Sequence, residues 1–171
     1  MKRLILLRHA KSSWDDPSLA DFDRPLAPRG RRATTRLARY MRETALNFDL
    51  VLCSGAERAR ETWGRIAEAI GSNAPTEYED SLYLAGSGSL MIRLSTLDPW
   101  VNAVLVVGHN PDLEMLAQRL CRDGTGDALR RLEEKYPTGG LSEIALDCED
   151  WPDLKDGCGT LMSFIVPREL P

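Results

Sequence analysis

The sequence contains only two histidines, His9 and His109, in 171 residues. Its four cysteines form no C-x-x-C pair and do not cluster with the histidines; they are Cys53, Cys121, Cys148 and Cys158. Zinc sites and small disulfide-rich secreted proteins both need a denser cysteine pattern than this. We therefore expect reduced thiols, no metal site and a cytoplasmic location.

Long apolar runs are also lacking. The first run, Leu4–Leu7, follows two basic residues as in a secretory signal, but Arg8 and His9 interrupt it after only four residues. Export needs a longer apolar core, and spanning a bilayer needs about 20 apolar residues. We expect no contact with a membrane.

The chain has no excess of positive charge and few aromatic residues. Its formal net charge is -4, and aromatic residues make up 6% of it. Nucleic-acid-binding domains carry a net basic surface, so we expect no nucleic-acid partner, although a local pocket of arginines remains compatible with the total. One arginine run is interpreted as the solvated face of a helix: Arg29, Arg31, Arg32, Arg36, Arg39 and Arg42.

Apolar runs and helical patterns alternate along the chain. Strands are expected at 4–8, 49–54 and 102–108, and a short strand followed by a loop at 75–83. Helices are expected at 28–44, between Ala56 and Gly71, at 89–97 and at 111–122. This order predicts one α/β domain over residues 1–171, with a mostly parallel sheet and helices on both faces. Residues 122–135 are expected to be a surface excursion with a helical patch at 129–135. Runs 141–146 and 159–166 are expected to form a closing hairpin at the sheet edge.

Both histidines fall at the ends of expected strands. His9 follows Arg8 at the end of the first run, and His109 follows Gly108 at the end of the run at 102–108. Open α/β sheets bind their ligands beside the carboxyl ends of strands. Histidines in this position favour a chemical role over simple packing.

Arg8, His9, Arg58 and His109 could together form a pocket for a tetrahedral dianion. A guanidinium group can bind two phosphate oxygens at once through two of its N–H groups, and it stays charged. One imidazole could then attack phosphorus and form a phosphohistidine, which divides hydrolysis into two easier displacements. Because the cationic side chains supply the charge, we expect neither a metal nor another cofactor.

Three motifs in this order resemble the histidine phosphatase superfamily, which has the phosphoglycerate-mutase-like fold. They are Arg8-His9-Ala10, Ser54–Thr62 and Gly108-His109-Asn110. Within that superfamily, the short chain, Asp23–Leu26 with Gly30 after it, and Pro137–Gly140 resemble the small phosphohistidine phosphatases of the SixA type. Three motifs, each at a strand end, are far more specific than a single Arg-His pair.

The resemblance implies a role for each matching residue. His9 would be the nucleophile that becomes phosphorylated, Arg8 and Arg58 would bind the phosphoryl oxygens, and His109 would donate a hydrogen bond to them. Further contacts to the substrate are expected from Ser12 and Asn110 and from the backbone amides near Ala10 and Asn110.

The chain also departs from members of the superfamily that act on phosphoglycerate. Lys11 and Asp15 stand where those members carry other residues, and Leu82–Ala85 contains no carboxylate where they have an acidic glutamate. The upstream candidates for an acid are Glu77, Glu79 and Asp80. A leaving imidazole has a lower pKa than a sugar hydroxyl and needs less help from an acid. The missing carboxylate therefore favours phosphoramidate hydrolysis and disfavours a mutase.

The function expected from the sequence is a metal-independent phosphatase that forms a phosphohistidine on His9 and acts on a phosphohistidine of a signalling or carrier protein. Two alternatives remain open. One is a small-molecule or phosphoserine phosphatase with the same four residues. The other is a module that binds phosphorylated proteins through its arginines without turnover.

Trp151 is expected to pack in the core, while Trp14, on the loop after His9, could pack or flank the site.

Overall fold

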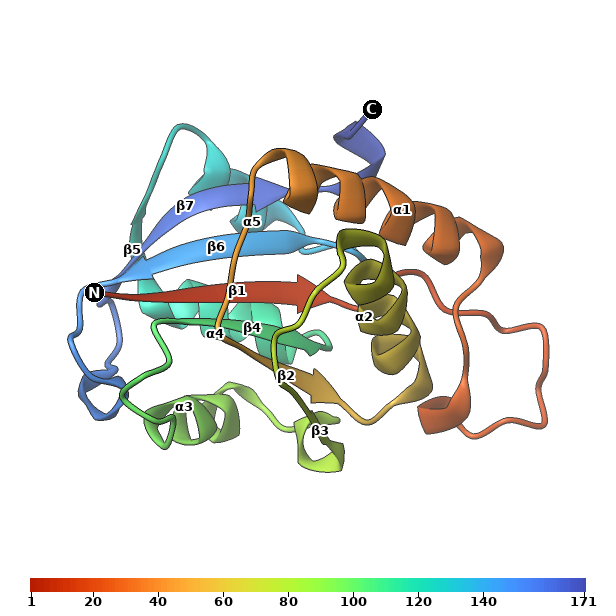
Figure 1. The fold of residues 1–171 in the computed structure, drawn as a ribbon, viewed down its shortest axis with the longest axis horizontal. Coiled ribbons are helices and arrows are strands. Elements are labelled where there is room, and N and C mark those ends of the chain that lie inside the picture. The colour runs from red at the N-terminus through yellow and green to blue at the C-terminus, as the bar shows by residue number, and fades with distance from the viewer.

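A computed structural model describes residues 1–171, which build one seven-stranded sheet in the order β3-β2-β4-β1-β6-β7-β5 (Figure 1). The strands are β1 (Lys2–Arg8), β2 (Leu50–Ser54), β3 (Thr76–Glu79), β4 (Ala103–Gly108), β5 (Cys121–Gly124), β6 (Leu141–Leu146) and β7 (Gly159–Ile165). The pairs β1–β4, β2–β4, β2–β3 and β5–β7 are parallel, whereas β1–β6 and β6–β7 are antiparallel. The sheet is therefore mostly parallel, as expected.

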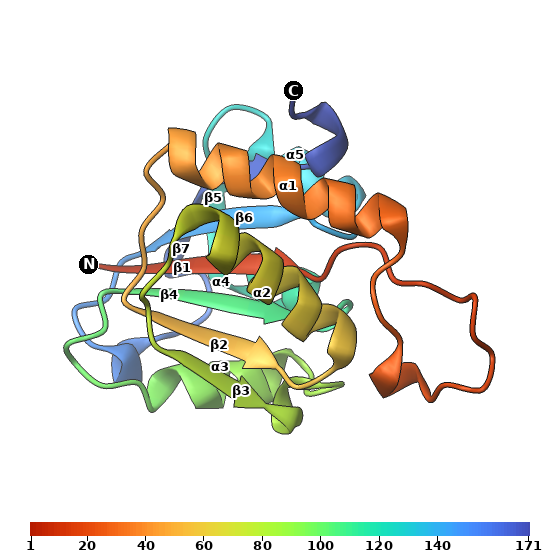
Figure 2. The ribbon, with the colours of Figure 1, turned by 45° about the vertical axis from the view of Figure 1, so that its right-hand side comes forward.

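Helices cover both faces of this sheet. They are α1 (Pro28–Glu43), α2 (Glu57–Ile70), α3 (Ser87–Ser95), α4 (Asp112–Leu120) and α5 (Ala128–Glu134). Figure 2 shows α1 and α2 together in front of the sheet, while α3, α4 and α5 pack against the opposite face. No helix is long and apolar enough to cross a membrane.

β1 lies in the middle of the sheet because its side chains are apolar on both faces. Leu4 and Leu6 belong to the core beneath α3 and α4, while Ile5 and Leu7 belong to the core beneath α1 and α2, and all four are fully buried. Side chains alternate across a strand, so a continuous apolar run is what a strand covered on both faces requires.

The first two helices begin and end where local chemistry predicts. α1 starts with Pro28, which fits the first helical turn because its missing N–H would have no partner there. α2 ends before Gly71, whose φ of 64° is the left-handed conformation common after helices.

The 3-10 turn at Trp151 buries that side chain completely, and its indole N–H donates to the carbonyl of Val101 at 2.8 Å. The expectation that Trp151 packs in the core is confirmed.

Three expectations for the C-terminal half were wrong. The expected helix at 111–122 ends at Leu120, and Cys121–Gly124 forms β5, which pairs with β7 and is the true edge of the sheet. The β6–β7 hairpin therefore lies inside the edge, with β6 next to β1. The helical patch expected at 129–135 is confirmed as α5, but its fully buried Leu132 means that residues 122–135 are not only a surface excursion. β5 has only four residues, two of them exposed and charged, so no apolar periodicity marks it.

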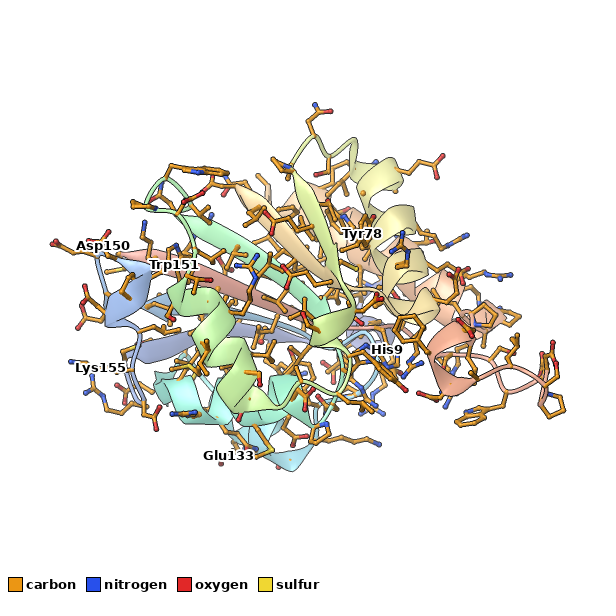
Figure 3. All side chains as sticks on the ribbon, turned by 90° about the horizontal axis from the view of Figure 1, so that it is seen from below. His9, Tyr78, Glu133, Asp150, Trp151 and Lys155 are labelled. Atoms are coloured by element: carbon orange, nitrogen blue, oxygen red, sulfur yellow. The ribbon has the colours of Figure 1, made fainter.

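The topology brings both histidines to one edge of the sheet. β1, β2 and β4 run parallel, so their carboxyl ends lie together, and His9 and His109 directly follow β1 and β4. Figure 3 shows His9 and Trp151 toward opposite ends of the strands. This is the ligand-binding edge of an open α/β sheet.

Candidate active site

The backbone at His9 is fixed by strands and by a late loop. Its N–H donates to the carbonyl of Gly108 at 3.0 Å. The N–H of Gly139 lies 3.1 Å from the carbonyl oxygen of Arg8 and 3.0 Å from that of His9. Gly139 has a φ of +74°, a backbone conformation that residues other than glycine rarely adopt. The Pro137–Gly140 segment thus folds directly against the Arg8-His9 pair.

The ring of His9 is held in one tautomer. Nδ1 lies 2.8 Å from the carbonyl oxygen of Ala10, which can only accept, so Nδ1 carries the proton. Nε2 therefore keeps its lone pair and accepts a hydrogen bond from Nε of Arg58 at 3.3 Å. The ring is only 7% exposed, and burial lowers the pKa of His9 to about 3. At neutral pH, His9 is an uncharged imidazole whose Nε2 carries a lone pair and no proton.

His109 faces His9, with their ring centroids 5.2 Å apart. Nε2 of His109 lies 2.7 Å from the hydroxyl oxygen of Ser54, which accepts the N–H of Ala56 at 3.2 Å. The Ser54 hydroxyl can then donate to Nε2, which places the imidazole proton on Nδ1. Nδ1 is buried without a partner in the protein. Burial lowers the pKa of His109 to about 4, so this ring is neutral as well.

The two predicted arginines complete the cluster. Arg58 is buried and bound on two sides, since one Nη donates to the carbonyl of Asp21 at 2.6 Å and the other to its carboxylate at 3.0 Å. Arg8 donates to the carbonyl of Tyr136 at 2.8 Å, and its buried Nε has no partner. Together with both histidines, they line a cavity of about 240 Å³. The structure therefore brings together the four residues expected to carry the chemistry.

The arginines near Arg58 lie elsewhere. The guanidinium of Arg60 stacks over the ring of Tyr78, 4.3 Å from its centroid, and Arg65 donates to the hydroxyl of Thr34. Neither lines the cavity. Arg58 is therefore the arginine of the Ser54–Thr62 motif that reaches the site.

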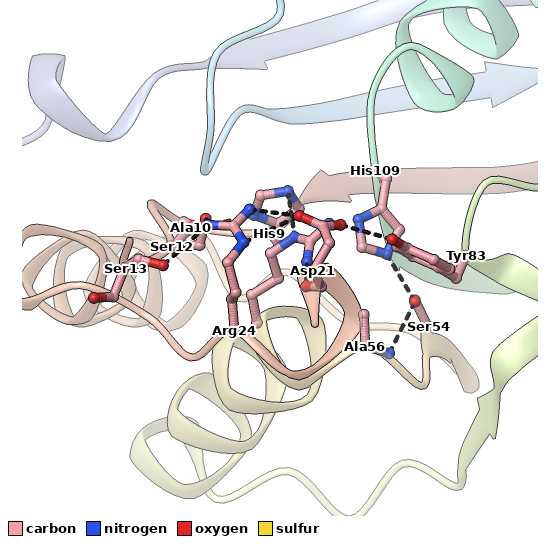
Figure 4. A network of polar contacts seen from close by, with 11 residues as sticks. His9, Ala10, Ser12, Ser13, Asp21, Arg24, Ser54, Ala56, Tyr83 and His109 are labelled. Carbon is pink, nitrogen blue, oxygen red and sulfur yellow. Dashed lines mark hydrogen bonds and ion pairs between the residues drawn. The ribbon is translucent and has the colours of Figure 1, made fainter. Parts of the chain in front are cut away.

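Asp21 is a site residue that the sequence did not reveal. One of its carboxylate oxygens accepts from Arg58 and from the hydroxyl of Tyr83 at 2.6 Å (Figure 4). The other accepts from Nε and Nη2 of Arg24 at 3.0 and 2.9 Å. The hydrogen bond from Tyr83, with support from both arginines, holds the pKa of Asp21 well below its usual range. Asp21 therefore remains ionised and positions two guanidinium groups.

None of the three upstream acids reaches the cavity. Glu77 and Glu79 form ion pairs with Arg93, and the carboxylate of Asp80 lies against Gly55. A Cβ at Gly55 would lie 1.8 Å from that carboxylate oxygen, so the Asp80 side chain sits directly over the glycine. None of these carboxylates lines the cavity with the histidines.

Ala10 and Asn110, where further contacts to the substrate were expected, form hydrogen bonds within the protein. The backbone N–H of Ala10 itself donates to the hydroxyl of Thr62 at 3.0 Å and is therefore already paired within the protein. Asn110 lines the cavity, but its amide group donates to Glu114 and to the carbonyl of Tyr136.

Ser12 and Trp14 are among the residues of the loop after β1 that line the cavity. Ser12 accepts from Arg24 at 2.8 Å and keeps its own hydrogen for another acceptor. Trp14 is 69% exposed, and the guanidinium of Arg24 stacks 3.5 Å from its ring centroid. Of the two readings left open for Trp14, the structure favours the one in which it flanks the site.

Comparisons with known proteins agree with this geometry. Residues 4–83 match the model of the histidine phosphatase superfamily (branch 1). An uncharacterized protein of Mycobacterium tuberculosis is 39% identical over 164 residues, which cover 95% of this chain and 100% of that protein. The structure of a candidate phosphohistidine phosphatase SixA from Nakamurella multipartitia is similar with a TM-score of 0.83 at 29% identity, covering 97% of this chain and 96% of that one.

A second solved structure gives the same result at slightly higher identity. The candidate phosphohistidine phosphatase SixA from Agrobacterium tumefaciens is 30% identical, with a TM-score of 0.79, and the match covers 97% of this chain and 98% of that one. The relatives therefore span the whole sheet, including strands β4 to β7, which the family model does not reach. This chain belongs to the histidine phosphatase superfamily.

Proposed function

We propose that this protein is a metal-independent phosphatase that hydrolyses phosphohistidine on a partner protein through a phosphorylated His9. One observation carries the proposal: Nε2 of His9 is an unprotonated, buried nitrogen with two guanidinium groups and a second neutral imidazole around it. The likeness to candidate phosphohistidine phosphatases supports the choice of substrate.

In the first step, Nε2 of His9 attacks the phosphorus of the substrate. A new N–P bond forms, and the N–P bond to the substrate imidazole breaks. Arg58 gives up its 3.3 Å contact with Nε2 and turns to a phosphoryl oxygen, while Arg8 and Nδ1 of His109 bind the remaining oxygens. The Nδ1–H of His9 stays bonded to Ala10, which stabilises the positive charge of the phosphorylated ring.

In the second step, water attacks the phosphorus of the phosphorylated His9. The N–P bond breaks, the oxygen and both hydrogens of the water leave as dihydrogen phosphate, and His9 returns as a neutral imidazole with its proton still on Nδ1. The same guanidinium groups stabilise the charge on the transferring phosphoryl group in both steps.

The lack of a free acid at the cavity favours phosphohistidine over a phosphate ester. Glu77 and Glu79 pair with Arg93, and Asp21 is held ionised by Tyr83 and the arginines. An ester releases a strongly basic alkoxide that needs a proton from the enzyme. A substrate phosphohistidine can take its proton on the other ring nitrogen beforehand and then leave as neutral imidazole.

The rim of the cavity suits a side chain presented by another protein. Trp14 and Leu84 line it and are 69% and 68% exposed. A small, open cavity of this kind admits a phosphorylated ring that projects from a protein surface.

The test compares turnover of a phosphohistidine peptide, a phosphoserine peptide and a sugar phosphate by the wild type and by His9→Ala. We expect selective hydrolysis of the phosphohistidine peptide and its loss in His9→Ala. Faster turnover of phosphoserine or of the sugar phosphate would instead identify a phosphomonoesterase. Binding of phosphopeptide by both proteins without turnover would identify a recognition module.

A further inference from the structure

A second, larger groove of about 520 Å³ lies beside the catalytic cavity. One wall is the first half of α1, from which Arg29, Arg32 and Arg36 line the groove, with the small Ala33 between them. Their spacing of three and four residues places them on one face of the helix, along about 10 Å of its length. The interpretation of these arginines as a merely solvated face was therefore incomplete.

The opposite wall comes from segments that are distant in the sequence. Lys135 and Thr138 precede β6, and Arg168 lies in the short 3-10 helix at Pro167–Glu169. Figures 1 and 2 both show the C-terminal end of the chain beside α1. Together with Arg8 and Lys11, cations from four separate segments thus converge on one groove.

The groove adjoins the catalytic cavity. Arg8, Lys11 and Thr138 line both of them. A ligand in the groove would therefore be continuous with a phosphoryl group held at His9.

Every cation of this groove lacks an acidic partner. None of its arginines and lysines takes part in an ion pair, and no Asp or Glu lines it; the ion pairs of the protein all lie elsewhere. This concentration is notable in a chain with 26 acidic and 22 basic residues. Like charges three and four residues apart destabilise a helix, and a bound anion relieves that repulsion.

The lining also indicates which anion fits. The groove contains no aromatic side chain, so it offers no surface on which a nucleobase could stack. Ala33, Val166 and two prolines are its only apolar residues, which is too little for a lipid chain. The arginines extend too far for one phosphate, but a row of carboxylates matches their spacing.

We propose that this groove binds an acidic, Asp- and Glu-rich segment of the substrate protein next to its phosphohistidine. The inference rests on the proposed function and extends it by naming the surface that the enzyme recognises. Attraction between the groove and such a segment increases the association rate and lowers KM, and salt screens it.

The test uses two phosphohistidine peptides that differ only in the residues flanking the phosphohistidine, which are Asp and Glu in one and Ser and Gln in the other. For the wild type, we expect kcat/KM to be about tenfold higher for the acidic peptide at low salt, mainly through KM, and nearly equal for both at about 0.5 M salt. In Arg32→Glu/Arg36→Glu, the ratio should fall to one or below.

Arg39→Glu/Arg42→Glu is the matched control. It makes the same change of charge on the same helix, but these two arginines lie outside the groove, so the ratio should stay high. Equal kcat/KM values for both peptides with the wild type at low salt, or a ratio that survives Arg32→Glu/Arg36→Glu, would overturn the proposal.

Calorimetric binding of the same two peptides without phosphate separates this inference from the proposed function. We expect the wild type and Arg39→Glu/Arg42→Glu to bind the acidic peptide, and Arg32→Glu/Arg36→Glu not to bind it. If neither phosphopeptide is hydrolysed, the proposed function fails, whatever the binding result. If both are hydrolysed but the acidic peptide does not bind better than the neutral one, only the groove proposal fails.

Discussion

Acidification from pH 7 to pH 5 should destabilise this protein through His9 and His109. Burial lowers their pKa values to about 3 and about 4, whereas an unfolded histidine titrates near 6.5. Below about pH 6.5 the unfolded state therefore binds more protons than the folded state. The free energy of unfolding consequently decreases as the pH is lowered. At pH 5, about 1.5 pH units below the unfolded pKa, this amounts to about 2 kcal/mol for each ring.

The two rings together should therefore lower the free energy of unfolding by about 4 kcal/mol between pH 7 and pH 5. They are only 7% and 3% exposed, so solvent screens little of this effect. Ordinary carboxyl groups titrate near pH 4 and remain mostly ionised in this window, which leaves the histidines as the main source of the change.

Urea unfolding at several pH values measures this dependence, and His9→Gln is the matched variant, in which about half of it should disappear. Because the chain has only two histidines, NMR can also follow each ring separately. Neither should titrate between pH 8 and pH 5. A ring pKa near 6.5, or a free energy of unfolding that does not change with pH, would refute the argument that His9 is a buried neutral nucleophile.

Two further predictions concern the supports of the site. Asp21→Asn should lower kcat for a phosphohistidine peptide about tenfold, because the charged acceptor that holds Arg58 at 3.0 Å is lost; steady-state kinetics measures this. Gly30→Ala should lower the free energy of unfolding by about 1–3 kcal/mol, because its Cβ would lie 2.2 Å from the carbonyl oxygen of Lys11 on the loop after His9; chemical denaturation measures this.

Each of these predictions has a control within the chain. Asp23 is exposed and lies on the same short 3-10 helix as Asp21, so Asp23→Asn should leave kcat unchanged. Gly64 has nothing within 4 Å of its Cβ position, and Gly64→Ala should stabilise α2 by about 0.5–1 kcal/mol. An equal loss of kcat in Asp23→Asn, or an unchanged stability of Gly30→Ala, would contradict the corresponding structural argument.

The sheet and the positions of both histidines could be predicted because their signals are local. Leu4–Leu7 is apolar on both faces of β1, and His9 directly follows that run. The edge strand β5 could not be predicted, since its exposed Arg122 and Asp123 form no apolar pattern and only its pairing with β7 defines it.

The positioning of Arg58 depends on contacts that no local pattern encodes. Asp21, on the short 3-10 helix at Asp21–Asp23, lies 37 residues from Arg58 and 62 from Tyr83 in the sequence, yet its carboxylate binds both. The same limit applies to Ser54, whose motif was visible but whose hydrogen bond to His109 spans 55 residues. The motifs located the groups proposed to react, whereas the residues that orient them became visible only in the folded chain.

The most direct test of the account is to trap and map the phosphorylated enzyme. The protein is mixed briefly with a phosphohistidine peptide, quenched in alkali and analysed by mass spectrometry. The account predicts phosphate on the imidazole of His9, formed and lost fast enough to support turnover, and no phosphorylation in His9→Ala. Phosphate on another residue, or unchanged turnover by His9→Ala, would contradict it.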